Sequence, residues 1–183
     1  MRIPITISGL HGTGKSTYAA TLADYFNLRH VSSGTIFRSV AKERNLSLET
    51  LSKEAERDPE LDRLIDAVTK AEAKKGSVVI DGLLTAWMTL NMDTVKIFLT
   101  APEKIRMQRI SKRDNLPFSE ARRVTLLREE SEKSRFKKYY NFDLDDYSIY
   151  DLVINTSLLS VDSNLKVLKT LIKECLNTKN RRM

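Results

Sequence analysis

The chain alternates short apolar runs, rich in β-branched residues, with longer stretches in which apolar residues recur at helical spacing. The short runs are typical of buried parallel strands, and the longer stretches predict amphipathic helices. Strands are expected at about 2–8, 29–32, 77–81, 95–99 and 151–155. Helices are expected at about 15–26, 34–44, 47–56, 59–75, 102–113, 117–140 and 160–176. Strands and helices therefore alternate along the chain.

This alternation predicts an α/β fold, a parallel five-stranded sheet flanked by helices on both faces. No internal repeat and no Gly-, Ser- or Pro-rich linker interrupts the pattern, so we expect a single domain over 1–183. Two helical segments exceed the minimal core, at 33–75 and at 114–142. Both follow carboxyl ends of strands, where open α/β sheets bind ligands. We interpret the first as a clamp for one ligand and the second as a lid over another.

Composition limits the class of protein further. The 183 residues are 41% hydrophobic and 30% charged, as in a soluble globular protein. No apolar run is long enough to cross a bilayer, and the chain enters a strand at once. We therefore expect no membrane anchor, no signal peptide and a cytoplasmic location. Cys175 is the only cysteine, which excludes a disulfide within this sequence and a cysteine-based metal site.

The net charge of +7 arises from 31 Lys and Arg against 24 Asp and Glu. Such a balance fits a surface that binds nucleic acid, and it equally fits arginines placed around the phosphates of a nucleotide. The cations form no single stripe but recur at helical spacing in the second half of the chain. A short basic tail at 179–182 is expected to be solvated and frayed. Charge alone leaves both interpretations open.

Residues 9–16 read GLHGTGKS, the G-x-x-x-x-G-K-[ST] spacing of a phosphate-binding loop (P-loop). An apolar strand precedes the motif and a helix follows it. In that setting backbone N–H groups and the helix dipole converge on one point, which binds polyphosphate. Lys15 is expected to reach the β- and γ-phosphates, and the Ser16 hydroxyl to ligate Mg²⁺. A chance glycine turn is the alternative, which the agreement of motif and context disfavours. We therefore expect the chain to bind a nucleoside triphosphate.

The residues expected to contact that nucleotide run continuously through the loop and into the following helix. They are Ser8, Gly9, Leu10, His11, Gly12, Thr13, Gly14, Lys15, Ser16 and Thr17. At His11 only the backbone need matter. His30 is expected to end a strand without a chemical role, and neither histidine has partners at metal-ligand spacing.

Asp81 ends an apolar strand and is followed by Gly82. At that position a carboxylate can act on the Mg²⁺ shell or orient the acceptor of a phosphoryl group. The alternative is a turn residue at the end of a strand. The P-loop favours the functional interpretation.

Two pairs of arginines lie at helical spacing in the second half of the chain. Arg109 and Arg113 are four residues apart and Arg128 and Arg135 seven, so each pair shares a helix face. Guanidinium groups suit phosphate oxygens better than ammonium groups do. The alternative is a solvated helix with ion pairs, since glutamates lie among the second pair. Two same-face pairs favour phosphate contacts. Arg38, just after the second strand, is a candidate for the phosphate of the acceptor.

The chain resembles the nucleoside monophosphate (NMP) kinases, and most closely the archaeal type of cytidylate kinase. The matching stretches are 9–17, 31–38, 128–132 and 148–157, which follow one another in family order over nearly the whole chain. The first is shared by all P-loop proteins. The second and the fourth are more specific, because adenylate and thymidylate kinases differ there.

The resemblance implies a P-loop NTPase fold with an NMP-binding insertion and a lid, and the Mg²⁺-dependent reaction ATP + CMP ⇌ ADP + CDP, with dCMP as a second acceptor. By matching position, Arg38, Arg128 and Arg135 would hold the monophosphate or bridge the reacting phosphates. Arg109 and Arg113 would belong to the lid over ATP. No general base is required, because the acceptor phosphate is already ionised. The family favours a monomer.

The expected catalytic set is therefore Lys15, Arg109, Arg128 and Arg135. The expected acceptor-binding set is Ser33, Arg38, Asp81, Arg128 and Arg135. Mg²⁺ is expected at Ser16, with Asp81 acting through its shell.

One position departs from the family pattern. Its members commonly carry an arginine after the Asp/Glu-Gly turn, where it contacts the acceptor phosphate, but here Leu83 follows Gly82. This bears on the affinity and identity of the acceptor and not on the donor site. Trp87 fits either a stacking role on a base or a place in the core.

Two other functions remain open. One is a kinase of the same fold for AMP, UMP or a non-nucleotide acceptor. The other is a nucleotide-regulated RNA-binding or ribosome-assembly factor, for which the charge of +7 would be the footprint. That function predicts a basic face away from the cleft, whereas the arginines group in the lid-like segment. We therefore rank it last and do not expect a nucleic-acid partner.

Overall fold

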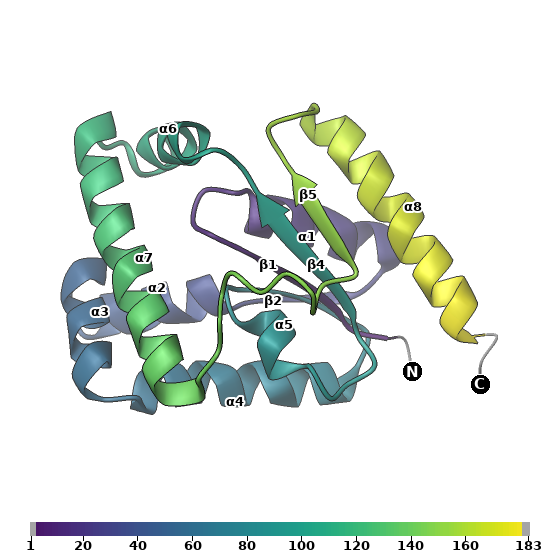
Figure 1. Ribbon diagram of the computed structural model, residues 1–183, viewed down its shortest axis with the longest axis horizontal. Coiled ribbons are helices and arrows are strands. Elements are labelled where there is room, and N and C mark those ends of the chain that lie inside the picture. The colour runs from purple at the N-terminus through teal and green to yellow at the C-terminus, as the bar shows by residue number, and fades with distance from the viewer. Residues whose placement is uncertain (1–2, 181–183) are drawn as a thin grey trace.

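The computed structural model describes residues 3–180 and has the predicted α/β fold (Figure 1). The strands are β1 (Ile5–Gly9), β2 (Arg29–Ser32), β3 (Val78–Asp81), β4 (Val95–Thr100) and β5 (Leu152–Asn155). They form one sheet in the order β2-β3-β1-β4-β5, and every neighbouring pair is parallel. The prediction of a parallel five-stranded sheet is confirmed. Residue 2 of the expected first strand and residues 181–182 of the basic tail lie outside the described residues.

The helices follow the predicted order, with one addition. They are α1 (Lys15–Phe26), α2 (Ser33–Glu43), α3 (Leu48–Arg57), α4 (Glu60–Lys75), α5 (Thr85–Met88), α6 (Glu103–Asp114), α7 (Phe118–Tyr140) and α8 (Val161–Asn180). Helix α5 was not predicted, because one turn is too short to show a helical period. Within residues 3–180 no helix is long and apolar enough to cross a membrane.

The core lies around the central strand β1, whose five residues are all buried. Ile5 and Ile7 are fully buried and belong to one apolar cluster with Leu22 of α1 and Leu168 and Ile172 of α8. Burial of this kind is worth roughly 1.5–3 kcal/mol for each large aliphatic side chain. The sheet therefore forms a fixed base at whose carboxyl edge the loops can hold ligands.

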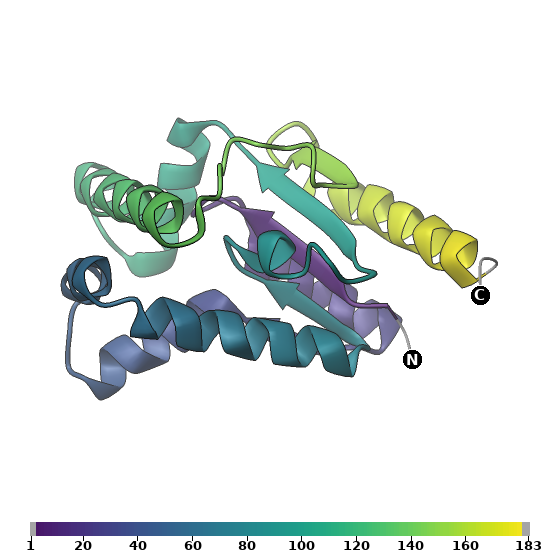
Figure 2. The same cartoon turned by 60° about the horizontal axis from the view of Figure 1, so that its bottom comes forward.

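Two groups of helices project from that carboxyl edge. Helices α2, α3 and α4 form one group, and α6 and α7 form the other (Figure 1). The groups meet where the Tyr139 hydroxyl of α7 donates to the carbonyl oxygens of Ala55 (3.2 Å) and Glu56 (2.9 Å) in α3. Figure 2 shows α7 lying across from α3 and α4. The two segments singled out in the sequence therefore face each other beside the ends of the strands.

Candidate active site

A cavity of about 600 Å³ lies between these two groups of helices and the ends of the strands. That size is within the range of small-molecule sites. Most of the site residues expected from the sequence line it: His11, Gly12, Gly14, Lys15, Ser16, Thr17, Ser33, Arg38, Asp81, Arg109, Arg113, Arg128 and Arg135. Ser8, Gly9, Leu10 and Thr13 are not among the lining residues and belong to the backbone support of the loop.

The P-loop is pressed against its neighbours at two glycines. A Cβ at Gly9, where φ is +145°, would lie 2.2 Å from the carbonyl oxygen of Leu99. A Cβ at Gly12, where φ is +78°, would lie 2.5 Å from the carbonyl oxygen of Arg106. Both positions therefore require glycine for conformation and for space. The close approach to β4 and α6 fixes the loop ahead of α1.

Lys15, at the first position of α1, folds back over the loop. Its Nζ donates to the carbonyl oxygen of Leu10 at 2.9 Å. Burial lowers the pKa of Lys15 to about 8, against the opposing effects of Asp81 and Glu132. The ammonium group is therefore held next to the loop, where the phosphates of a nucleotide would bind.

Asp81, at the end of β3, forms hydrogen bonds with three side chains. Its Oδ2 accepts from the hydroxyls of Ser16 (2.9 Å) and Ser32 (3.2 Å), and its Oδ1 lies 2.7 Å from Nε2 of His30. Because a carboxylate only accepts, His30 donates through Nε2. His30 therefore contacts Asp81 from β2 without lining the cavity, and the expectation that it has no chemical role stays a prediction. The alternation of side chains along β2 offered a signal, since residues 30 and 32 share a face of the strand.

Ser16 and Asp81 together fit a magnesium site. A hydroxyl and a carboxylate are oxygen ligands of the kind that Mg²⁺ prefers, and this ion normally keeps waters and substrate phosphates as its other ligands. Among residues 3–180 no group of three or more His, Cys, Asp and Glu could hold a metal ion. The donor set suits an ion that arrives with a nucleotide.

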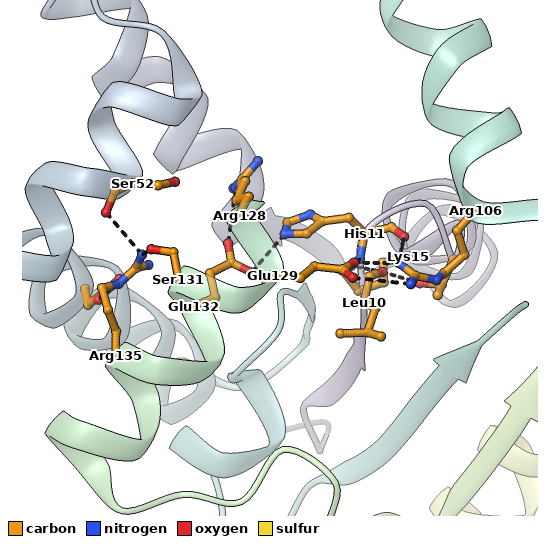
Figure 3. A network of polar contacts seen from close by, with 12 residues as sticks. Leu10, His11, Lys15, Ser52, Arg106, Arg128, Glu129, Ser131, Glu132 and Arg135 are labelled. Atoms are coloured by element: carbon orange, nitrogen blue, oxygen red, sulfur yellow. Dashed lines mark hydrogen bonds and ion pairs between the residues drawn. The ribbon is translucent and has the colours of Figure 1, made fainter. Parts of the chain in front are cut away.

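Helix α7 is tied to the P-loop by a buried polar network (Figure 3). Glu132 Oε2 lies 2.8 Å from His11 Nε2, and its Oε1 accepts from Arg128 Nε at 3.2 Å. Glu129 accepts from the backbone N–H of His11 at 3.1 Å and also pairs with Arg106. The side chain of His11 thus has a specific partner, which the sequence did not reveal because the pairing joins residues 11 and 132.

Burial sets the charges in this network. It lowers the pKa of His11, against the opposing effect of the Glu132 carboxylate, to which Nε2 donates. Burial alone would raise the pKa of Glu132, but His11 and Arg128 outweigh it and hold that pKa at about 2. The guanidinium of Arg128 also lies over the ring of Phe37, 4.6 Å from its centroid. Arg128 is therefore held at the cavity by two contacts.

Arg135 is held even more firmly. Its Nε and Nη2 donate to the two carboxylate oxygens of Asp62 in α4, at 2.8 and 3.2 Å. Its Nη1 donates to Ser131 Oγ at 2.9 Å, and the side chain is 2% exposed. Arg128 and Arg135 do line the same cavity, as their spacing predicted. Arg135, however, is engaged by a carboxylate before any phosphate binds.

Arg109 and Arg38 line the same cavity and are held by other partners. Arg109 donates to the hydroxyl (2.9 Å) and the carbonyl oxygen (3.1 Å) of Thr156, after β5. Arg38 donates to the Thr35 hydroxyl, and its pKa is lowered by burial and by the nearby charges of Arg113 and Arg128. These guanidinium groups therefore concentrate positive charge in the cavity.

The lining also includes residues of α4 that the sequence did not single out, namely Asp62, Ile65, Asp66 and Thr69. Leu83, the position that departs from the family pattern, lines the cavity from the turn after β3. Trp87 of α5 is not among the lining residues. Its ring stacks on Phe142, with centroids 4.6 Å apart, in a cluster that packs α5 against the end of α7. Of the two roles considered for Trp87, the structure supports the place in the core.

Comparison with known proteins places this geometry in a family. Residues 5–135 match the protein family described as AAA domain. A cytidylate kinase from Staphylothermus marinus is 48% identical over 174 residues, which cover 95% of this chain and 98% of that protein. A cytidylate kinase from Methanocaldococcus jannaschii is 46% identical over 171 residues, which cover 92% and 96% of the two chains.

Solved structures share the fold at much lower identity. A shikimate kinase from Bacteroides thetaiotaomicron has a TM-score of 0.61 at 16% identity and covers 93% of this chain and 98% of its own. A gluconokinase from Sinorhizobium meliloti has a TM-score of 0.64 at 12% identity and covers 100% and 99%. These similarities concern the fold alone. They confirm the α/β fold expected from the sequence.

Proposed function

We infer that this chain, which belongs to the family of cytidylate kinases, transfers the γ-phosphate of Mg·ATP to CMP or dCMP. The products are ADP and CDP or dCDP. The observation that carries this inference is one continuous cavity that contains the P-loop lysine, the Ser16–Asp81 pair and five arginines. Phosphoryl transfer needs alignment, dryness and positive charge more than covalent help, and this cavity supplies them.

The donor end is the P-loop. Its backbone N–H groups and Lys15 bind the β- and γ-phosphates of ATP, and Lys15 exchanges the Leu10 carbonyl for a phosphate oxygen. Ser16 would hold Mg²⁺, with Asp81 next to it. When bound, Mg²⁺ neutralises charge on the β- and γ-phosphates. We assign Arg109, which donates to the carbonyl oxygen of Gly12 in the P-loop, and Arg113 of the same helix to the donor.

The acceptor end lies between α2, α4 and α7. Arg38 and Arg128 bind the phosphate of CMP, and Ser33 lies beside them in the cavity lining. An oxygen of that phosphate forms a bond to the γ-phosphorus as the bond from this phosphorus to the β–γ bridging oxygen breaks, and ADP leaves. The chain supplies no general base, because the attacking phosphate is ionised. Arg128, which Glu132 links to His11 of the P-loop, is placed to contact both reactants.

The two insertions have separate tasks in this proposal. Residues 33–75 clamp the acceptor, and residues 114–142, which carry Arg128 and Arg135, exclude water. Leu83 lines the cavity where the family commonly has an arginine, so Arg38 and Arg128 carry more of the charge on the acceptor phosphate. We further propose that the protein acts as a monomer in the cytoplasm.

The test is a coupled assay of ADP release with Mg·ATP against CMP, dCMP, UMP, AMP and GMP. We expect kcat/KM for CMP to exceed that for the other ribonucleotides by at least about tenfold, which corresponds to about 1.4 kcal/mol of discrimination. An equal or higher value for AMP or UMP would assign another acceptor to the cavity. ATP binding without turnover of any monophosphate would refute the proposed reaction.

A further inference from the structure

The acceptor end of the cavity contains a carboxylate that no step above uses. Asp66 lies on α4, lines the cavity and is 7% exposed. One turn earlier on the same helix, Asp62 also lines the cavity, but both of its oxygens are taken by Arg135. Among residues 3–180 no arginine, lysine or histidine forms an ion pair with Asp66. The two carboxylates therefore differ: one is neutralised within the protein, and the other is open to a ligand.

Asp66 is nevertheless fixed in place. The hydroxyl of Tyr140, the last residue of α7, donates to its Oδ2. An ionised carboxylate has about four acceptor sites. Because Tyr140 fills one of them, the group keeps acceptor capacity toward the cavity, in a rotamer held by a neighbour. A buried carboxylate in this state favours a ligand that donates hydrogen bonds.

The position of Asp66 relative to the phosphate-binding groups suggests which part of a nucleotide it meets. Helix α7 runs past the carboxyl ends of the strands, and its C-terminal end lies next to α4 (Figure 1). Along α7, Arg128 contacts the network of the P-loop, Arg135 contacts Asp62, and Tyr140 contacts Asp66. A phosphate held by Arg128 and Arg38 therefore leaves the base of the acceptor to extend toward α4. Ile65 and Phe136 supply apolar lining at that end.

We propose that the carboxylate of Asp66 selects the acceptor base by accepting a hydrogen bond from the 4-amino group of cytosine. This proposal rests on the proposed function and specifies its base-reading residue. A carboxylate accepts from the 4-amino group of cytosine, whereas uracil has a carbonyl oxygen at that position. Uracil would place two acceptors against each other in a buried site, and such a mismatch is costly. Adenine also carries an amino group, so Asp66 distinguishes amino bases from keto bases. Discrimination between a pyrimidine and a purine ring depends on the rest of the cavity.

The test is the variant Asp66→Asn, assayed with CMP and UMP at saturating Mg·ATP. The carboxamide has the size of the carboxylate, and its oxygen can still accept from Tyr140, which turns the NH₂ donor toward the base. The ratio of kcat/KM for CMP to that for UMP should fall by about 10- to 100-fold, with a rise in kcat/KM for UMP itself. The KM for ATP should not change. A rise in kcat/KM for UMP in Asp66→Asn is a result that damage to the fold alone would not give.

Two variants serve as controls. Asp24→Asn replaces an exposed carboxylate on α1 and should leave the ratio unchanged. Tyr140→Phe keeps the carboxylate but removes the hydrogen bond that holds it, so kcat/KM for CMP should fall without a gain for UMP. If Asp66→Asn binds ATP as the parent does and keeps the CMP to UMP ratio within about threefold, Asp66 does not read the base. A parent protein that does not phosphorylate CMP refutes the proposed function instead.

The unmodified protein gives an independent readout. Burial raises the pKa of Asp66 to about 6; the Tyr140 hydroxyl opposes the shift, the nearby Asp62 adds to it, and Lys70 opposes it. A protonated carboxyl group can donate to the uracil oxygen, so the CMP to UMP ratio should fall as the pH is lowered from about 8 to about 5.5. The phosphates of the two substrates titrate alike and cancel in the ratio. A ratio that stays constant over this range contradicts the proposal.

Discussion

Individual side chains in this cavity are held by protein groups at the positions where we expect nucleotide groups to bind. Lys15 donates to the Leu10 carbonyl, and Glu129 accepts from the backbone N–H of His11. Ser16 donates to Asp81. These contacts satisfy buried polar groups that a phosphate would otherwise satisfy. Nucleotide binding must therefore exchange one set of hydrogen bonds for another, which makes single substitutions informative.

The pKa of Lys15 predicts how ATP affinity depends on pH. Because burial lowers that pKa to about 8, the free protein loses the ammonium charge as the pH rises through this value. The affinity for Mg·ATP, measured by calorimetry, should fall between about pH 7.5 and 9.5. Lys15→Met should bind weakly over the whole range without this break. An affinity that is constant to pH 9.5 in the unmodified protein would show that the charge of Lys15 contributes nothing to binding.

We expect Glu132 to couple the binding of the two substrates, because it contacts both His11 of the P-loop and Arg128. Glu132→Gln removes the charge that faces Arg128 and His11, and Arg128 then loses its ion pair. The KM for CMP should rise by about tenfold or more, with a smaller change for ATP. Glu130→Gln, an exposed change on the same helix, is the matched control. Equal kinetics for the two variants would mean that Glu132 does not position Arg128.

At the scale of elements, the sheet was the most predictable part. The apolar runs that end at residues 81 and 99 are buried strands, as their β-branched composition predicted. The P-loop was predictable because one short segment holds strand end, glycines, lysine and helix start. The partners of the arginines were not predictable. Which carboxylate Arg128 or Arg135 meets depends on how α7 packs against the P-loop and α4, and no local pattern records that.

We expect the buried Arg135–Asp62 ion pair to stabilise the packing of α7 against α4. Arg135→Ala leaves a buried aspartate without its cation, which should lower the free energy of unfolding by about 3–5 kcal/mol. Urea denaturation measures this. The combined variant Asp62→Leu, Arg135→Met removes both charges and should recover much of the loss.

The matched control for this pair is Arg123→Ala. Arg123 lies on the same helix in exposed ion pairs with Glu120 (2.9 Å) and with Glu49 of α3 (3.5 Å), so its loss should leave stability nearly unchanged. If Arg135→Ala is as stable as Arg123→Ala, the buried pair does not hold the two helices together, and the interpretation of Arg135 as a phosphate ligand gains weight.

At the scale of the whole molecule, the helices that follow β2 meet the helices that follow β4 over one edge of the sheet. Tyr139, Arg135 and Tyr140 join α7 to α3 and α4, and Glu129 and Glu132 join it to the P-loop. One helix thus contacts both the donor end and the acceptor end of the cavity. No pattern in the sequence indicated that the segments 33–75 and 114–142 touch, because that contact joins residues about 80 positions apart. The charge of +7 is in part explained by the cavity arginines.

The proposed reaction is the transfer of a phosphate from ATP in this P-loop to a cytidylate. The most direct measurement follows ATP, ADP, CMP and CDP together by chromatography in one reaction with Mg²⁺, for the unmodified protein and for Lys15→Ala. We predict that ADP and CDP form in equal amounts and that Lys15→Ala, folded as the parent is, slows both by orders of magnitude. ADP formed without CDP would show that the phosphate does not reach CMP, and CDP formed at the parental rate by Lys15→Ala would show that the P-loop lysine takes no part in the transfer.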